Sequence, residues 1–337
     1  MKATAAGILV STIVIARIVT TDELNNKKQE SCVGIRQSPR QIDRICGEDS
    51  SLCYTVHIGL FDEPSNKQIV ARILRYEGRP HVLADTVVRL VPPSGINETH
   101  DLCLDDYKTW KLDNSYIPGE YAAGILSSMF LFHSLSMDSP DSRKQVLVLG
   151  AGAGGIDMAL HSRKPYVNIT GVDIDELVLN IGKKWFGSLE SDTHHLIVQD
   201  GIAFVENAAA QGRKFDFVAV DACGDEQSFP CPHKAFRSEN FLQNVKKILT
   251  PTGTLTFNLL GRSQDSGKFY ERIKQIFACW FIKFPAVENL VLTCLPNWDP
   301  AYGNISRLQS DFEALVRIMK LEYLLNDAIL VPWYKKQ

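Results

Sequence analysis

The run of small and apolar residues from Val146 to Gly155 constrains the fold of this chain more than any other feature. Its apolar half predicts a buried strand, and the glycines that follow predict a tight turn into a helix. A second strand-like segment, ending in Val172–Asp175, follows at the distance expected of a βαβ unit. Glycines let the backbone approach a ligand closely, and an acid at the next strand end can accept hydrogen bonds from ribose hydroxyls. This order of strand, glycines, helix and acid predicts a nucleotide-type ligand.

Two further strands are predicted downstream, and each ends in an acid. His195–Val198 leads to Asp200 and Gly201, and Phe215–Val220 leads to Asp221. In open α/β sheets, ligands bind at the carboxyl ends of the parallel strands. These strand ends therefore predict one polar edge on a doubly wound parallel sheet.

The series of strand ends resembles the class I S-adenosylmethionine-dependent methyltransferase fold, a Rossmann-like α/β fold with a seven-stranded sheet. The resemblance implies S-adenosyl-L-methionine as the cofactor. The glycine loop would lie near its methionine part, the acid after the second strand at its ribose, and the Asp-Gly pair near its adenine. The cofactor-binding residues implied in this way are Gly150, Gly152, Gly154, Asp173, Ile174, Asp200, Gly201 and Glu120.

The segment that begins at Asp221 narrows the resemblance. Asp221–Asp225, Cys231–Phe236 and Phe241–Gly253 resemble the spermidine synthase-like branch of the methyltransferases. Within that branch they are most similar to the C-terminal domain of the methyltransferases that modify translation elongation factor 1-alpha. The likeness covers roughly residues 110 to 300. It implies methyl transfer to an amine-type acceptor, on a protein or on a small molecule.

The chemistry of such a transfer indicates candidate catalytic residues. A methyl group on a sulfonium is already activated, so much of the rate can come from positioning and electrostatics. An amine acceptor arrives largely protonated, and a carboxylate at the fourth strand end can orient it and help its proton leave. We predict Asp221 for this role, with Asp225 as a second candidate. Two alternatives stay open: Asp221 contacts only the cofactor or caps a turn, and Asp225 is a solvated loop charge.

Residues 116–135 predict the first helix of this domain, and Glu120–Phe130 has the spacing of an amphipathic helix. In the resembling family the start of this helix borders the cofactor and acceptor pocket. The resemblance therefore implies that Tyr116 and Glu120 line the site. The alternative is that Tyr116 only packs and that Glu120 is a first-turn acid favoured by the helix dipole.

The N-terminal third is organised differently. Residues 1–20 begin with a basic residue and continue as a short apolar run, which predicts a signal peptide or, if uncleaved, a membrane anchor. Residues 21–48 are interpreted as linker, 49–112 as a small β-rich domain and 113–337 as the methyltransferase domain. A signal peptide would direct the chain to the secretory pathway, for secretion or the endoplasmic reticulum lumen. An uncleaved segment would anchor it to a membrane, and a segment that is not a signal would leave it in the cytoplasm.

Cysteines and glycosylation sequons also bear on the compartment. Cys32, Cys46, Cys53 and Cys103 precede the predicted nucleotide domain, and four further cysteines lie within it. The N-terminal four permit two disulfides, although the pairing is not fixed by sequence and eight reduced thiols are the alternative.

The sequons at Asn97 and Asn304 lie in loop-like contexts that can carry glycans, whereas Asn168 leads into a predicted buried strand. The pair His194 and His195 is interpreted as a surface feature at a strand start. No Cys or His spacing indicates a metal.

The net charge is −3 and the basic residues are dispersed, so nothing in the composition indicates a nucleic-acid partner. The oligomeric state cannot be read from the sequence.

Three function classes remain. The first class is a methyltransferase acting on a protein or small amine. The second is a polyamine aminopropyltransferase, whose family carries a tighter Asp-x-x-Asp pattern than the Asp221-x-x-x-Asp225 found here. The third is a non-catalytic secreted protein that kept the fold.

Overall fold

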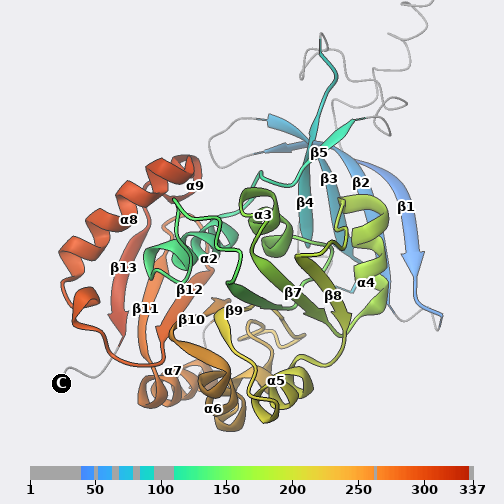
Figure 1. The fold of residues 1–337 in the computed structure, drawn as a ribbon. Coiled ribbons are helices and arrows are strands. Elements are labelled where there is room, and N and C mark those ends of the chain that lie inside the picture. Colours follow the sequence, from blue (N-terminus) through green and yellow to red (C-terminus); the bar gives the residue numbers. More distant parts are fainter. Residues whose placement is uncertain are drawn as a thin grey trace, which may run out of the picture.

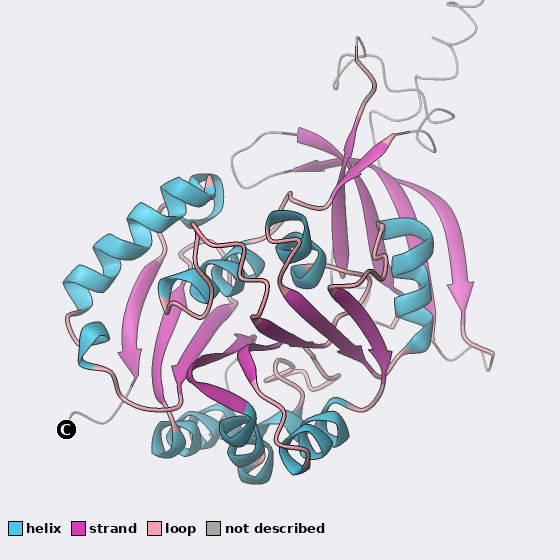
Figure 2. Ribbon diagram, viewed as in Figure 1, coloured by secondary structure: helices cyan, strands magenta, loops and turns pink. Residues whose placement is uncertain are grey.

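The structure is a computed structural model that describes residues 39–48, 52–62, 68–78, 84–94, 110–261 and 264–333. It contains two sheets with helices around the larger one (Figures 1 and 2). The predicted leader at 1–20, Cys32, Cys103 and the sequon at Asn97 lie outside the described residues, so the interpretations made of them stay predictions.

A five-stranded antiparallel sheet, with its strands in chain order, forms the N-terminal part of the molecule. Its strands are β1 (Arg40–Cys46), β2 (Cys53–Asp62), β3 (Gln68–Tyr76), β4 (Thr86–Val91) and β5 (Lys111–Asp113). Strand β1 lies within the segment interpreted as linker. A register shift between Gln41 and Asp43 breaks the two-residue alternation of this strand. As a result Ile42 and Ile45 both pack on the sheet, and the sequence shows no strand period there.

The larger sheet has eight described strands in the order β13-β11-β12-β10-β9-β6-β7-β8, where seven were expected. The strands from β10 to β8 in this order run parallel, and β13, β11 and β12 add an antiparallel edge. The additional strand is β13, which contains Pro332; proline is tolerated there because β13 is an edge strand. The strands are β6 (Gln145–Leu149), β7 (Asn168–Asp173), β8 (His194–Val198), β9 (Phe215–Val220), β10 (Leu249–Leu259), β11 (Ala278–Lys283), β12 (Leu290–Leu295) and β13 (Ile329–Trp333).

Helices cover both faces of this sheet, and α2, α3, α8 and α9 lie on the face opposite α5, α6 and α7 (Figure 1). Alternate residues of β6 enter the two cores, Val146 and Val148 on one side and Leu147 and Leu149 on the other. This two-sided burial explains why the strand reads as a continuous apolar run. The helices are α2 (Glu120–Leu131), α3 (Ile156–Arg163), α4 (Glu176–Ile181), α5 (Gly201–Ala210), α6 (Glu239–Ile248), α7 (Gln264–Ile276), α8 (Ile305–Met319) and α9 (Glu322–Leu325).

Helix α2 is not amphipathic in its surroundings. It packs against β10, β12, α3, α8 and α9, so nearly all of its residues from Ala123 to Leu131 are buried. Burying one leucine, isoleucine, methionine or phenylalanine side chain contributes about 1.5–3 kcal/mol to the free energy of unfolding. Helix α2 buries several such side chains, so it is a central part of the core.

The two sheets are joined by α4 and a short π-helical segment, Gly182–Phe186. Val178, Ile181 and Phe186 from this region pack with apolar residues of β2, β3 and β4. At the edge of this contact, Asp43 of β1 accepts hydrogen bonds from Lys184 Nζ (2.7 Å) and Trp185 Nε1 (2.8 Å). The N-terminal sheet is therefore fixed against the larger domain.

Three disulfides connect described cysteines. Cys46–Cys53 joins β1 to β2, Cys279–Cys294 joins β11 to β12, and Cys223–Cys231 closes the loop after β9. Of the two disulfides that the four N-terminal cysteines permit, the described part of the chain contains one, Cys46–Cys53, and the other two of these cysteines lie outside it. Among the helices that the structure describes, none has the length and apolar character needed to cross a bilayer.

Candidate functional site

The candidate site lies at the point in the parallel sheet where the order of the strands along the chain reverses. Strands β6 and β9 are neighbours, and β7 and β8 follow on one side while β10 follows on the other. The loops that leave β6 and β9 therefore diverge and open a crevice at the carboxyl edge. The glycine loop leaves β6 at Gly150, and Asp221 directly follows β9.

The glycine loop is shaped by backbone conformations that other residues rarely adopt. The φ angles of Gly150, Gly152 and Gly154 are 85°, 56° and 95°. A Cβ on Gly150 would lie 2.8 Å from the backbone of Asp221, so this glycine lets the two loops touch. A Cβ on Gly152 or Gly155 would meet nothing within 4 Å. The loop thus presents bare backbone to open space, as close approach of a nucleotide-type ligand requires.

Asp173, at the end of β7, is tied to this loop. One carboxylate oxygen accepts a hydrogen bond from the Gly152 amide (2.8 Å) and the other from the Asp175 amide (3.0 Å). Burial raises the pKa of Asp173, and the nearby charge of Asp175 adds to this, although the backbone hydrogen bonds oppose it. The neighbouring Ile174 is 71% exposed and borders the cavity, an unusual position for an apolar side chain.

Asp200 and Gly201 begin helix α5. The Asp200 side chain caps the helix by accepting hydrogen bonds from the Ile202 (2.7 Å) and Ala203 (3.1 Å) amides. Asp200 also lines the cavity, so capping occupies only part of its carboxylate. A Cβ on Gly201 would lie 3.1 Å from the Phe236 ring, so the glycine leaves room for an apolar wall.

A cavity of about 840 Å³ extends from this edge to the N-terminal sheet. Glu120 is buried at the start of α2 and lines it, as does the buried Tyr116. None of the described lining residues is a lysine or an arginine. The wall carries five carboxylates, which belong to Asp85, Glu120, Asp173, Asp200 and Asp221. Such a wall favours cationic ligands.

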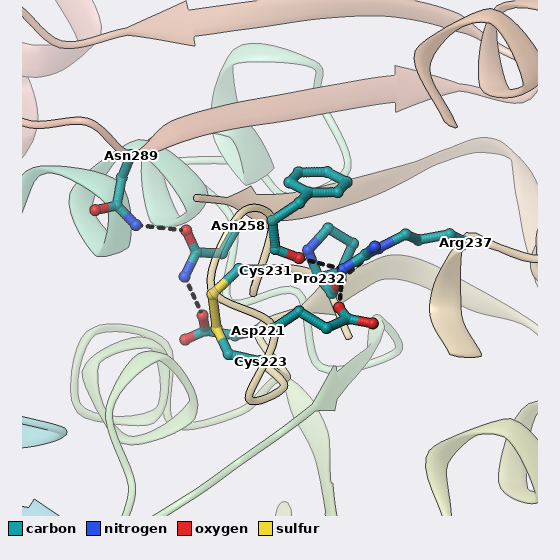
Figure 3. The surroundings of a disulfide bond; sticks show 9 residues. Asp221, Cys223, Cys231, Pro232, Arg237, Asn258 and Asn289 are labelled. Carbon is teal, nitrogen blue, oxygen red and sulfur yellow. Dashed lines mark hydrogen bonds and ion pairs between the residues drawn. A yellow bond between two sulfur atoms is a disulfide. The ribbon is translucent and has the colours of Figure 1, made fainter. Parts of the chain in front are cut away.

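Asp221 lines the cavity and takes part in a chain of hydrogen bonds (Figure 3). Asn258 Nδ2 donates to Asp221 Oδ1 (2.8 Å), and Asn289 Nδ2 donates to Asn258 Oδ1 (2.9 Å). Since the Asp221 carboxylate can only accept, Asn258 turns its amide nitrogen toward it, and the Asn258 oxygen is left to accept from Asn289. We call these three residues the amide relay. It orients Asp221 without neutralising it.

Asp225 occupies a different position from Asp221. It is exposed on the loop after β9 and is not among the residues that line the cavity. The same loop brings Cys223, Cys231 and His233 to the cavity wall. Among the described residues, no group of three or more His, Cys, Asp or Glu side chains is placed to hold a metal ion.

Comparisons with known proteins agree with this geometry. Residues 126–261 match the spermine/spermidine synthase domain. This part of the chain is therefore similar to a spermidine synthase domain. A Drosophila pseudoobscura pseudoobscura protein named as an eEF1A lysine and N-terminal methyltransferase homolog is 30% identical over 209 residues, which are 58% of this chain and 31% of that protein. The chain thus aligns with less than a third of this relative.

Two solved structures share the fold of the spermidine synthase-like domain. Human methyltransferase-like protein 13, crystallised with SAH, gives a TM-score of 0.52 at 26% identity, covering 60% of this chain and 92% of that one. A probable spermidine synthase from Corynebacterium glutamicum gives 0.58 at 12% identity, covering 88% and 91%. The second likeness covers more of this chain than the residues that match the spermine/spermidine synthase domain.

Several residues of the site escaped the sequence reasoning. Asn258 carries a readable signal, a polar residue near the end of a buried strand, whereas Asn289 lies in a connecting loop that gives none. Tyr54 comes from the N-terminal sheet, and its hydroxyl donates to Asp175 Oδ2 (2.7 Å). Burial and this contact raise the pKa of Tyr54, which keeps the hydroxyl a donor.

The surface position predicted for His194 is wrong. His195 is exposed, but His194 is fully buried, with Nε2 2.9 Å from Asp157 Oδ2 and Nδ1 2.9 Å from the Leu189 carbonyl. Burial alone lowers the pKa of His194, but its hydrogen bonds and the charge of Asp157 outweigh burial and raise it. Because both facing atoms are acceptors, the ring donates from both nitrogens. This ion pair lies behind the glycine loop, since Asp157 is in the first turn of α3.

Proposed function

We propose that this chain is an S-adenosylmethionine-dependent methyltransferase that acts on an amine. The observation that carries the proposal is the cavity wall, in which a bare glycine loop and five carboxylates occur without any described lysine or arginine. Both a sulfonium and an ammonium are cations, and such a wall favours both. When bound, S-adenosylmethionine supplies a methyl group that its positive sulfur has already activated.

The residues present fit this cofactor. The space beside Gly152 and Gly155 would be filled by any Cβ, so it suits close contact with a ligand. In this proposal Asp173 accepts ribose hydroxyls with its remaining lone pairs, and Asp200 contacts the adenine. Ile174 and Phe236 offer apolar contact for the base. Glu120, buried at the start of α2, also lines the cavity.

Asp221 acts on the acceptor in this proposal. It receives the ammonium, orients it toward the cofactor and takes the proton that the nitrogen must lose before attack. The amide relay keeps one carboxylate oxygen in place through Asn258. Asp225 is exposed, so of the two predicted carboxylates only Asp221 reaches the cavity, which favours methyl over aminopropyl transfer.

The acceptor that we propose is an amine on a protein. The relative from Drosophila pseudoobscura is named for lysine and N-terminal methylation, and both groups are protein amines. We further propose that the chain works in an oxidising compartment, because three disulfides connect its described cysteines. The predicted leader would direct it there.

Calorimetric titration tests this proposal. The chain from residue 21 onward is titrated with S-adenosylmethionine, S-adenosylhomocysteine and decarboxylated S-adenosylmethionine. Asp173→Asn should weaken binding of the first two by at least about tenfold, because a buried hydrogen bond to a charged group contributes about 1.5–3 kcal/mol. Asp225→Asn removes an exposed carboxylate outside the cavity and should leave affinity unchanged.

A second candidate, aminopropyl transfer, is favoured by the match to the spermine/spermidine synthase domain. A preference for the decarboxylated cofactor in the same titration would support it over methyl transfer. The absence of binding by a folded sample would contradict both activities and support a non-catalytic protein that kept the fold.

A further inference from the structure

The disulfide between Cys223 and Cys231 closes the loop that carries the acceptor end of the cavity (Figure 3). Asp221 lies two residues before the first cysteine and His233 two residues after the second, and all four residues line the cavity. We propose that this disulfide is a positioning device, which holds Asp221 and His233 in the arrangement that receives the acceptor amine. The inference rests on the proposed function.

The outgoing leg of the loop, residues 229–233, is anchored to the domain by side chains. The buried Arg237 donates from Nε to the Pro232 carbonyl (2.7 Å) and also to the Phe229 carbonyl. Its guanidinium lies 4.2 Å from the centre of the Phe229 ring. The Leu260 amide, just beyond β10, donates to the Cys231 carbonyl (3.0 Å). This leg is therefore held from two elements at once.

The incoming leg, residues 222–225, has weaker support, and the loop is next tied to the domain at Glu226, which accepts a hydrogen bond from the Arg237 guanidinium (2.7 Å). The described hydrogen bonds of the incoming leg are two backbone contacts with the other leg, from His233 to the Ala222 carbonyl (2.8 Å) and from Gly224 to the Pro230 carbonyl (2.8 Å). Each contributes only about 1 kcal/mol. The bond from Cys223 to Cys231 is the covalent connection between this leg and the anchored one.

Close packing makes the position of the incoming leg matter. A Cβ on Gly224 would lie 2.7 Å from the His233 ring, so this leg rests directly against a cavity-lining side chain. His233 Nδ1 accepts a hydrogen bond from the Ala235 amide (3.3 Å), and this bond fixes the orientation of the His233 ring. A shift of the leg would move the His233 ring and the backbone that follows Asp221 together.

Another disulfide of the same domain provides a stringent control. Cys279 and Cys294 lie opposite one another in the ladder of β11 and β12, they are fully buried, and neither lines the cavity. Their removal costs core packing as well as a bond, so it should destabilise the protein at least as much as removal of Cys223–Cys231. If acceptor binding is lost on removal of Cys223–Cys231 and kept on removal of Cys279–Cys294, the loss cannot come from general instability.

The experiment compares Cys223→Ala/Cys231→Ala with Cys279→Ala/Cys294→Ala and the unmodified chain. Calorimetry measures the affinity for S-adenosylhomocysteine and for an analogue whose sulfur is replaced by a nitrogen carrying a 2-aminoethyl arm. The ratio of the two affinities reports the acceptor end alone. We expect the unmodified chain and the control to prefer the analogue by about tenfold, through a charge-assisted contact of its ammonium with Asp221. Cys223→Ala/Cys231→Ala should lose this preference while its S-adenosylhomocysteine affinity stays within about twofold.

Other results overturn the inference in distinguishable ways. A preference that survives in Cys223→Ala/Cys231→Ala, or that is absent in the unmodified chain, shows that the bond does not position an acceptor site. Loss of S-adenosylhomocysteine binding in Cys223→Ala/Cys231→Ala shows that the bond supports the cofactor end or the fold. Absence of S-adenosylhomocysteine binding by the unmodified chain removes the proposed function, and the inference with it.

Discussion

Two loops meet at the carboxyl edge of the sheet, and they are held in different ways. The glycine loop after β6 is shaped by its own backbone, with three glycines at positive φ and an amide bonded to Asp173. The loop after β9 is shaped by the side chains of Arg237 and Asn258, which lie outside it, and by its own Cys223–Cys231 bond. The first loop keeps its form mainly through its own backbone conformation and one hydrogen bond to the end of the next strand. The second depends on distant partners, so acceptor recognition can change while the cofactor end stays the same.

The largest expected effect concerns the contact between the two loops. Gly150→Ala places a Cβ 2.8 Å from the Asp221 backbone at a φ of 85°, so it adds a clash to conformational strain. We expect it to lower the free energy of unfolding by about 3 kcal/mol and S-adenosylhomocysteine affinity by at least about tenfold. Thermal unfolding and calorimetry measure the two effects.

Gly212→Ala is the matched control for this change. Gly212 also has a positive φ, 67°, but a Cβ there meets nothing within 4 Å. It should cost only about 1 kcal/mol and leave the ligand affinity unchanged. Equal losses for the two variants would mean that strain alone matters and that the loops are not tightly packed against one another.

A smaller effect is expected from disrupting the amide relay. Asn289→Asp replaces the amide that donates to Asn258 with an acceptor, so either orientation of the Asn258 amide turns its oxygen toward a carboxylate, and its bond to Asp221 is weakened. We expect turnover of an amine acceptor to fall by about tenfold, equivalent to about 1.4 kcal/mol, with S-adenosylhomocysteine affinity unchanged. Steady-state kinetics and calorimetry separate the two ends of the cavity.

The control for added charge is Asn207→Asp, on the exposed side of α5. It should affect neither measurement. If Asn289→Asp lowers the affinity for S-adenosylhomocysteine by as large a factor as it lowers turnover, the two loops are not independent of one another.

The difference between a loop shaped by its own backbone and a loop held by distant side chains explains how much of the molecule could be predicted. The glycines, Asp173 and the strand before Asp221 lie in short local patterns, and the structure brings them to one edge as expected. Strand β1 was missed because of its bulge, and β13 because Pro332 argues against a strand. These two errors arise from local exceptions to the periodic rules.

The acceptor end was harder to predict for another reason. The partner of Cys223 cannot be read from sequence, because cysteine pairing depends on the fold. Asn289 acquires its role only when the β11–β12 connection folds next to β10. Asp225 was the second candidate after Asp221, and the loop directs it to solvent, which agrees with the alternative interpretation of a solvated loop charge. Residue type and spacing do not determine side-chain direction in a loop held by remote contacts.

The smallest expected effect concerns the buried pair of His194 and Asp157. This pair is a contact between distant residues that also supports the cofactor end. The two residues are 37 positions apart and fix the start of α3 behind the glycine loop. Since the folded chain raises the pKa of His194, its stabilising contribution is complete below pH about 6.5 and is lost as pH rises through the raised value. His161 acts in the opposite sense below that pH, because burial and the charge of His194 lower its pKa. Glu190 adds a favourable charge from the segment before β8.

Urea unfolding between pH 6.5 and pH 9 should therefore show a decline in the free energy of unfolding on the order of 1 kcal/mol from this pair. His194→Gln retains an amide donor for Asp157 but has no titrating proton, so it should remove that part of the decline. His195→Gln, at the exposed neighbour, should keep it. If both variants decline like the unmodified chain, the pair does not titrate in this range, and the start of α3 is held by the glycine loop and local packing alone.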